Sequence, residues 1–186
     1  YDIMNTMAKS FFVNPFEKKP NKDPMTPSYI KPDGTQVIEQ KTEIGLSVYE
    51  KCPDGTLLFR GYNTKNRLIM DYARDRNVEI SHHFDEFGKM IYKNESVYDE
   101  HNVLAKKDEY DYDYYDSGAK KTEIITSFPG EVTTYMQFEE NGKRIEKIVE
   151  RGTVKTWYDE NDKPLKREID RGSGGIITED LTKKEN

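Results

Sequence analysis

Cysteine is almost absent from this chain of 186 residues, which contains Cys52 and no second thiol. No disulfide can therefore form within the chain, and side-chain packing must hold the fold together. Alanine and leucine are also rare, with 4 and 7 residues. Because long helices draw heavily on both residue types, this scarcity argues against an all-helical protein.

Long apolar runs and an excess of positive charge are missing as well. No uninterrupted apolar stretch approaches the ~20 residues that a membrane-spanning helix needs, so the sequence predicts no membrane span. The 29 lysines and arginines are outnumbered by 35 acidic residues, which gives a formal net charge of -6 and a pI near 5.3. This balance argues against a nucleic-acid backbone as the main partner.

Strand-favouring residues are abundant instead. Valine, isoleucine, threonine, tyrosine, phenylalanine and tryptophan together occupy 59 positions. Branched and aromatic side chains fit a pleated sheet better than a helix. The composition therefore indicates a soluble, acidic, β-rich protein.

The two ends of the chain differ from its middle. Residues 1–27 combine near-helical spacing of apolar side chains with several prolines, which predicts a short N-terminal helix and an extended linker. Residues 172–186 begin with a glycine-rich stretch and end in charged residues, so we expect a flexible tail. The chain starts at Tyr1 rather than Met, and its composition favours an exported or periplasmic bacterial protein over a cytoplasmic one.

A short pattern recurs through the middle of the sequence. An aromatic or apolar residue, usually followed by an acid, precedes a Gly, Asn or Asp by four positions, and an alternating polar and apolar stretch follows. The best copies are residues 84–88, 98–102, 114–118, 138–142 and 158–162. With the poorer copies, the predicted turn positions are 34, 55, 76, 88, 102, 118, 142 and 162. Asp-Gly and Asn-Gly supply the positive φ angles of tight turns, so the pattern predicts consecutive hairpins.

These elements resemble a known class of repeats. Tyr158-Asp159-Glu160-Asn161-Asp162, followed by Lys-Pro-Leu-Lys-Arg-Glu, is similar to the YD/RHS repeats and MORN-variant repeats of bacterial surface, toxin-associated and antitoxin (immunity) proteins. The resemblance covers roughly residues 30–170. It implies successive antiparallel hairpins that form an extended twisted sheet or an open barrel. We therefore predict an all-β fold with one hairpin-repeat domain over residues 28–171.

The most unusual segment lies between residues 98 and 118, which hold seven acids and two lysines. Three tyrosines alternate there with two aspartates, so a strand places the tyrosines on one face and the aspartates on the other. Three interpretations stay open: tyrosines packed on a core, a contact surface for a basic protein, and an improvised calcium site that includes Glu109. The predicted partner-binding residues are Tyr110, Asp111, Tyr112, Asp113, Tyr114, Tyr115, Asp116 and Trp157.

No complete catalytic motif is present in the sequence. His82 and His83 are adjacent, and adjacent residues of a strand point to opposite faces, so they do not easily share one metal ion. Cys52 precedes a turn and has no nearby histidine to activate it. Carboxylate pairs are numerous, and no sequence rule selects one of them. We therefore predict no enzyme, no metal site and no cofactor.

Three functions are compatible with these features. The leading hypothesis is a non-enzymatic immunity protein that binds and neutralises a basic bacterial toxin through the acidic, tyrosine-rich segment. The second is a surface or periplasmic carbohydrate-binding or adhesion module, in which Trp157 and neighbouring tyrosines stack on sugar rings. The third is a hydrolase that uses one of the many carboxylate pairs. The sequence sets neither the partner's identity nor the oligomeric state.

Overall fold

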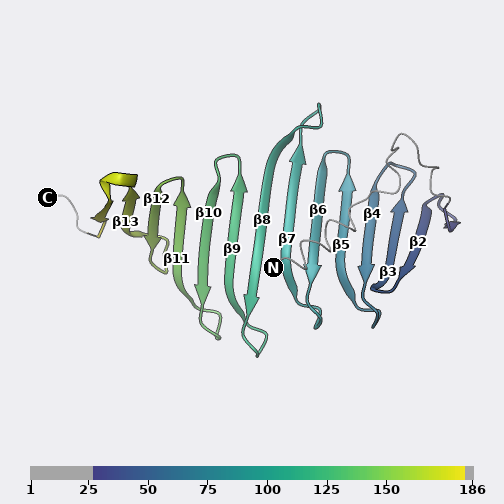
Figure 1. The fold of residues 1–186 in the computed structure, drawn as a ribbon, viewed down its shortest axis with the longest axis horizontal. Helices are drawn as coiled ribbons and strands as arrows, with labels where there is room; N and C mark the ends of the chain where they lie inside the picture. The colour runs from purple at the N-terminus through teal and green to yellow at the C-terminus, as the bar shows by residue number, and fades with distance from the viewer. Residues whose placement is uncertain (1–26, 183–186) are drawn as a thin grey trace. The chain divides into compact units, whose positions relative to one another are not determined.

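The computed structural model describes residues 27–182, which form fourteen β-strands and one short 3-10 turn, η1 (Gly172–Gly174). These residues contain no α-helix (Figure 1), so the all-β prediction is confirmed. The N-terminal helix predicted from the sequence lies outside the described residues. The chain forms two compact units, of which unit 1 ends at Arg76 and unit 2 begins at Asn77. The single hairpin-repeat domain over residues 28–171 stays a prediction from the sequence.

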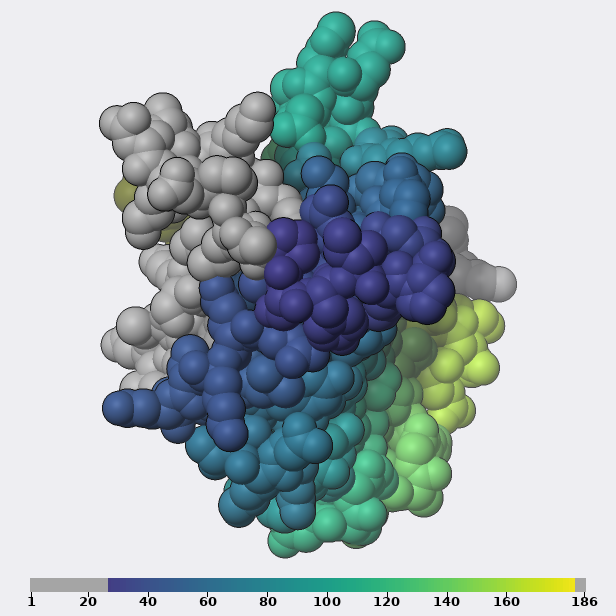
Figure 2. Space-filling view, turned by 90° about the vertical axis from the view of Figure 1, so that its right-hand side faces the viewer, coloured from purple at the N-terminus to yellow at the C-terminus, as the bar shows by residue number. Residues whose placement is uncertain are grey.

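Unit 1 is an antiparallel sheet of five strands that follow chain order. They are β1 (Tyr29–Ile30), β2 (Gln36–Thr42), β3 (Gly45–Lys51), β4 (Leu57–Tyr62) and β5 (Leu68–Asp75). The outer strands β1 and β2, purple in Figure 2, lie at the surface, and Tyr29 and Ile30 are exposed.

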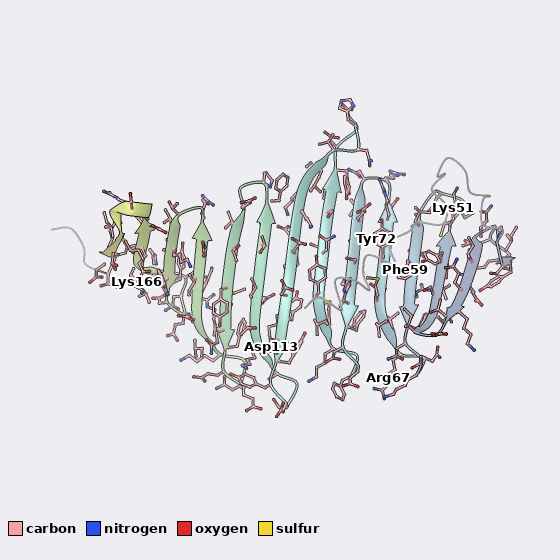
Figure 3. The ribbon with its side chains drawn as sticks, in the orientation of Figure 1. Lys51, Phe59, Arg67, Tyr72, Asp113 and Lys166 are labelled. Atoms are coloured by element: carbon pink, nitrogen blue, oxygen red, sulfur yellow. The ribbon has the colours of Figure 1, made fainter. Side chains whose placement is uncertain are left out.

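One face of unit 1 carries its hydrophobic core. Ile38, Tyr49, Phe59 and Tyr72 lie directly opposite one another on β2 to β5, so their side chains form one row. The rings of Tyr49 and Phe59 are 4.8 Å apart, and Met70 is buried beside them. Phe59 and Tyr72 are labelled on neighbouring strands in Figure 3. This row is the best-buried apolar cluster in the part of the chain that the structure describes.

The opposite face of unit 1 buries a charged residue. The Glu50 side chain is 8% exposed, and both of its carboxylate oxygens have cationic partners. Lys31 Nζ lies 2.7 Å from Oε2, and Arg60 Nη1 lies 3.2 Å from Oε1. A carboxylate withdrawn from water needs such partners, because an unpaired buried charge is strongly destabilising.

Unit 2 is an antiparallel sheet of nine strands, again in chain order. They are β6 (Val78–Phe84), β7 (Met90–Tyr98), β8 (Leu104–Tyr114), β9 (Lys120–Phe128), β10 (Val132–Phe138), β11 (Arg144–Arg151), β12 (Val154–Tyr158), β13 (Pro164–Asp170) and β14 (Ile176–Asp180). The sheet is open, which agrees with the predicted extended sheet. Within residues 77–182 the buried residues are polar, namely Ser81, Ser96 and Asp108. Most strand residues on both faces are half-buried.

A single type of turn connects most hairpins. In the turn of residues 85–89, the Asp85 N–H donates to the Lys89 carbonyl at 2.9 Å, and the Gly88 N–H donates to the Asp85 carbonyl at 3.1 Å. The same pair of hydrogen bonds recurs in turns beginning at residues 31, 52, 63, 99, 115, 139, 159 and 171. All eight predicted turn positions have positive φ and are confirmed as turns: Gly34, Gly55, Arg76, Gly88, Asn102, Gly118, Gly142 and Asp162.

Two features of the hairpins differ from the sequence prediction. The connections at residues 43–44, 63–67, 129–131 and 152–153 were not predicted. In the turn of residues 63–67, Asn66 has a φ of 57° and the Asn63 side chain accepts hydrogen bonds from two turn N–H groups. The predicted flexible tail of residues 172–186 contains β14, which pairs with β13 and places Ile177 opposite Ile169. The glycine-rich stretch therefore ends one strand by turning the chain into the next.

Truncating Phe59 should destabilise unit 1. The Phe59 side chain is 6% exposed in the core row, so Phe59→Ala should lower the unfolding free energy of unit 1 by about 3–5 kcal/mol. Native-state hydrogen exchange at the amides of β2 to β5 measures this change. The control is Ile44→Ala, at a side chain that is 45% exposed, with an expected effect within about 0.5 kcal/mol. Equal effects of the two variants would contradict the assigned core.

Adding one methyl group at Gly45 should also destabilise unit 1. Gly45 has a φ of 143°, and a Cβ atom there would lie 1.8 Å from the Tyr62 carbonyl oxygen. Gly55 has a φ of 94° with open space around it, so Gly55→Ala introduces backbone strain alone. We expect Gly45→Ala to cost at least about 2 kcal/mol more than Gly55→Ala in the same exchange measurement. Similar costs would show that β3 and β4 approach less closely here than the structure indicates.

Candidate partner-binding face

The two faces of the unit 2 sheet carry different charges. We call the face that bears Asp111 and the residues in register with it the Asp111 face, and the opposite one the Tyr110 face. On the paired strand positions, the Asp111 face holds nine acids (Glu79, Glu109, Asp111, Asp113, Glu146, Glu150, Glu168, Asp170, Asp180) and three lysines (Lys107, Lys155, Lys166). The Tyr110 face holds four acids (Glu95, Asp108, Glu123, Glu179) and seven bases (Lys93, Lys106, Lys120, Arg144, Lys147, Arg151, Arg167). The negative charge of the sheet is therefore concentrated on the Asp111 face.

The structure divides the predicted partner-binding residues between three places. Strand β8 places Tyr110, Tyr112 and Tyr114 on the Tyr110 face. It places Asp111 and Asp113 on the Asp111 face, where Trp157 of β12 also lies. Tyr115 and Asp116 belong to the turn between β8 and β9. The predicted alternation of tyrosines and aspartates is thus present. Asp111, Asp113 and Trp157 share one face, and the three tyrosines of β8 share the other.

Lysine side chains cover the three tyrosines of the Tyr110 face. The Nζ atoms of Lys93, Lys120 and Lys89 lie 5.2, 4.8 and 5.5 Å from the ring centroids of Tyr110, Tyr112 and Tyr114, respectively. The rings of Tyr110 and Tyr112 are stacked. Burial, and then the charge of Glu123, raises the pKa of Tyr112 to about 12. These contacts support the packing interpretation for the three tyrosines.

An apolar and aromatic row crosses the Asp111 face. Tyr92, Asp111, Ile124, Tyr135, Ile148 and Trp157 lie opposite one another on successive strands from β7 to β12. Carboxylates flank this row on both sides. Glu109, Glu150 and Glu168 lie two positions toward one end of their strands, and Asp113 and Glu146 lie two positions toward the other. The face therefore has an apolar centre with an acidic border.

Asp111 is the one charged residue within the row between Tyr92 and Trp157. Its carboxylate has no ion pair or hydrogen bond among the described residues. Asp111 is exposed on β8, but neighbouring side chains partly desolvate its carboxylate; this desolvation, and then repulsion from Glu109, raises the pKa of Asp111. Keeping this group ionised at neutral pH therefore works against folding.

Glu109 contributes a fixed negative charge beside Asp111. The Tyr92 hydroxyl donates a hydrogen bond to Glu109 Oε1 at 2.7 Å, and Lys107 Nζ lies 2.8 Å from the same oxygen. Burial alone would raise the pKa of Glu109, but the hydrogen bonds from Lys107 and Tyr92 outweigh it and lower the pKa. Glu109 is therefore ionised at neutral pH and holds Tyr92 in place.

One side of the Trp157 indole is occupied by a lysine. Lys166 Nζ, on the neighbouring strand β13, lies 3.9 Å from the centroid of the indole ring. The same ammonium group pairs with Glu168 at 3.1 Å. Figure 3 labels Lys166 and Asp113, which lie on this face at different strands. The lysine leaves less of the indole surface available for stacking on a sugar ring.

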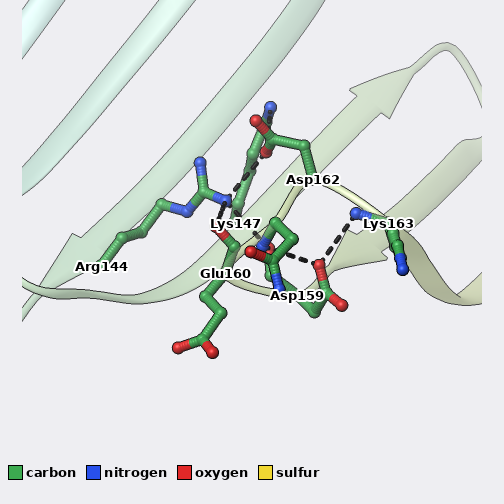
Figure 4. Close-up of polar contacts among 7 residues, drawn as sticks. Arg144, Lys147, Asp159, Glu160, Asp162 and Lys163 are labelled. Carbon is green, nitrogen blue, oxygen red and sulfur yellow. Dashed lines mark hydrogen bonds and ion pairs between the residues drawn. The ribbon is translucent and has the colours of Figure 1, made fainter.

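Contacts between turns and neighbouring strand ends connect the hairpins of unit 2 at one end of their strands. The Tyr115 hydroxyl donates to the Phe138 carbonyl at 2.8 Å, which ties the β8–β9 turn to the end of β10. Arg144 Nη2 donates to the Asp159 carbonyl at 2.8 Å and pairs with Asp162 at 2.8 Å (Figure 4). Lys147 also pairs with Asp162 at 2.9 Å. Tyr115 thus has a structural role, whereas Asp116 is exposed in its turn.

The sequence analysis missed several residues of the Asp111 face. Tyr92, Ile124, Tyr135 and Ile148 complete the row, and each follows the simple alternation of its own strand. The sequence does not show the register between strands, and that register is what brings these residues into one row. The two histidines lie on opposite faces of β6, as expected, since His82 pairs with Lys93 and His83 with Tyr92. Within residues 27–182 there is no group of three or more His, Cys, Asp or Glu side chains that could hold a metal ion.

Removing the charge of Asp111 should stabilise the fold at neutral pH. Its raised folded pKa means that the penalty is present above that pKa and disappears as the pH falls below the unfolded value of 3.8. Asp111→Asn should therefore raise Tm at pH 7, and the gain should vanish below pH ~4. Asp108→Asn is the control, because hydrogen bonds from Lys106 and Ser127 lower the pKa of Asp108. This variant should lower Tm at neutral pH, with the loss fading at acidic pH. Thermal unfolding at several pH values measures both, and a lower Tm for Asp111→Asn at pH 7 would contradict the prediction.

Comparison with known proteins does not assign the chain to a family. No family model matches the sequence, and a search of curated proteins gave no match. The part of the chain that the structure describes has no helix that is long and apolar enough to cross a membrane. Function must therefore be inferred from the residues and the geometry of the chain itself.

Proposed function

We propose that this chain is a non-enzymatic protein-binding module that binds a basic protein through the Asp111 face, and that it acts as an immunity protein that neutralises a bacterial toxin. The observation that carries the proposal is the unequal charge of the two faces of unit 2. Nine acids and three lysines lie on the Asp111 face, which also carries the aromatic row.

The layout of the Asp111 face matches that of protein interfaces. Such interfaces have an apolar centre enriched in aromatic residues and a polar border, and a few large side chains supply most of the binding energy. Tyr92, Tyr135 and Trp157 supply aromatic area in the central row, and the flanking carboxylates supply the border. An extended sheet face of this kind suits a protein surface better than a small molecule.

Charge favours a basic partner. Residues 77–186 contain 25 acids and 17 lysines and arginines, whereas residues 1–76 contain 10 acids and 12. Unit 2 therefore carries the negative charge of the chain and attracts cations over several ångströms. Asp111, which costs folding stability, has no cationic partner among the described residues, so a partner's ammonium or guanidinium group could neutralise it.

The immunity role rests on the resemblance of residues 30–170 to YD/RHS and MORN-variant repeats. Proteins with such repeats include antitoxins, and an acidic face that covers a basic active site is a direct way to inhibit a toxin. The carbohydrate-binding alternative has less support, because Lys166 covers one side of the Trp157 ring.

Capture experiments with matched variants test this proposal. The full chain is immobilised as wild type, as Asp111→Lys/Asp113→Lys, and as Glu179→Lys, a charge reversal on the Tyr110 face. Each is exposed to lysate and culture supernatant of the source organism, and retained proteins are identified by mass spectrometry. We expect one stoichiometric basic protein on the wild type and on Glu179→Lys, and little on the double variant. Expression of that protein should be toxic, and co-expression of this chain should restore growth.

The association rate should distinguish the two faces quantitatively. With the purified partner, Asp111→Lys/Asp113→Lys should slow association by about tenfold or more at low salt and weaken its salt dependence. Glu179→Lys should stay within about twofold of the wild type. Equal rates for all three proteins would exclude the Asp111 face as the binding site, and retention on cell-wall or glycan material alone would favour adhesion.

A further inference from the structure

A groove lies on the Asp111 face, where β9 and β11 end and β8 and β10 begin. It has a volume of about 500 Å³ and is lined by parts of β8, β9, β10 and β11 and by the turns that follow β9 and β11. Thr126 and Thr133, which lie opposite each other on β9 and β10, belong to its lining. A groove of this size accommodates a protruding side chain together with part of its backbone.

Carboxylates dominate the polar lining of the groove. Glu109, Glu131 and Glu150 line it, against the single lysine Lys107. Lys107 pairs with Glu109 at 2.8 Å, and Lys155 pairs with Glu150 at 3.1 Å. Glu131, exposed in the turn between β9 and β10, has no ion pair among the described residues. The groove therefore has a surplus of negative charge, which repels anions and attracts cations.

An exposed aromatic ring stands beside the unpaired carboxylate. Phe128 lines the groove at the end of β9, is 42% exposed, and is separated in sequence from Glu131 by two residues. Leu104 adds apolar surface. An aromatic face attracts cations, and a carboxylate binds a guanidinium group through two parallel hydrogen bonds. The combination therefore fits a planar cation on an aliphatic stem.

We propose that this groove is the anchor site for an arginine side chain of the basic partner. The guanidinium group stacks on Phe128 and pairs with Glu131, while the threonine hydroxyls face the stem. The inference rests on the proposed function and deepens it, because it names the side chain that the Asp111 face recognises. Arginine fits better than lysine, since a planar, weakly hydrated guanidinium can stack on a ring and bind a carboxylate at once.

Other ligands fit the groove less well. A phosphate or carboxylate group would meet three glutamates. A tightly held metal ion would need a cluster of ligating side chains, and no such cluster occurs within residues 27–182. A neutral sugar would leave the charge of Glu131 without a partner.

The groove can be tested without the natural partner. The probe is a capped pentapeptide with arginine between glycines, titrated at millimolar concentration into the isotope-labelled full chain and followed by NMR. The matched control peptide carries citrulline, which keeps the shape of arginine and lacks its charge. We expect the arginine peptide to shift the amide signals of residues 126–133 and the citrulline peptide to leave them unchanged.

Variants of the chain make the test specific. Glu131→Gln and Phe128→Leu should each weaken binding of the arginine peptide at least about fivefold, whereas Glu179→Gln on the other face should not. Glu150→Gln provides a second carboxylate variant if one of these proteins folds poorly. Absence of shifts at residues 126–133, or equal shifts with citrulline, would overturn the proposal. Because no partner protein is used, that failure is distinguishable from a failed capture by the Asp111 face.

Discussion

The register between neighbouring antiparallel strands is the constraint on which the rest of this structure depends. Side chains alternate between faces with a period of two, so a slip of one residue would move a strand's acids to the opposite face. The repeated turns prevent such slips, because each fixes two backbone hydrogen bonds and one positive φ angle. The unequal charge of the two faces of unit 2 is therefore a consequence of turn geometry.

The pairing of long cations with rings explains how a sheet with so few buried apolar residues can be stable. Lys93, Lys120 and Lys147 lie over aromatic rings of the Tyr110 face. Their stems cover apolar surface while the ammonium groups stay in water, and each such pair contributes about 0.5–1 kcal/mol. Unit 1 relies instead on a row of buried side chains around Phe59. The two units thus use different interactions to stabilise the same hairpin architecture.

Sequence reasoning succeeded where the signal was local and failed where it depended on pairing. The turn positions and the alternation of residues 110–114 follow from short patterns, and both are confirmed. Strand β14 was missed because it is short, follows a glycine-rich stretch and ends in two acids, and only its pairing with β13 makes it a strand. The aromatic row was missed for a related reason. Tyr92, Tyr135 and Trp157 are far apart in sequence, and no single-strand pattern shows that they become neighbours of Asp111.

The acids of the Asp111 face differ in whether they have partners within the chain. The Glu109 carboxylate already has partners within the chain, since Tyr92 and Lys107 bind it and lower its pKa. Asp111 and Glu131 have no ion pairs among the described residues, and partial desolvation penalises the charge of Asp111 although the residue is exposed on β8. If stability alone were selected, we would expect a neutral residue such as asparagine at position 111. An unpaired carboxylate within an aromatic row is advantageous only when a cation arrives from outside, because the same desolvation that weakens the free protein strengthens its ion pair in a complex.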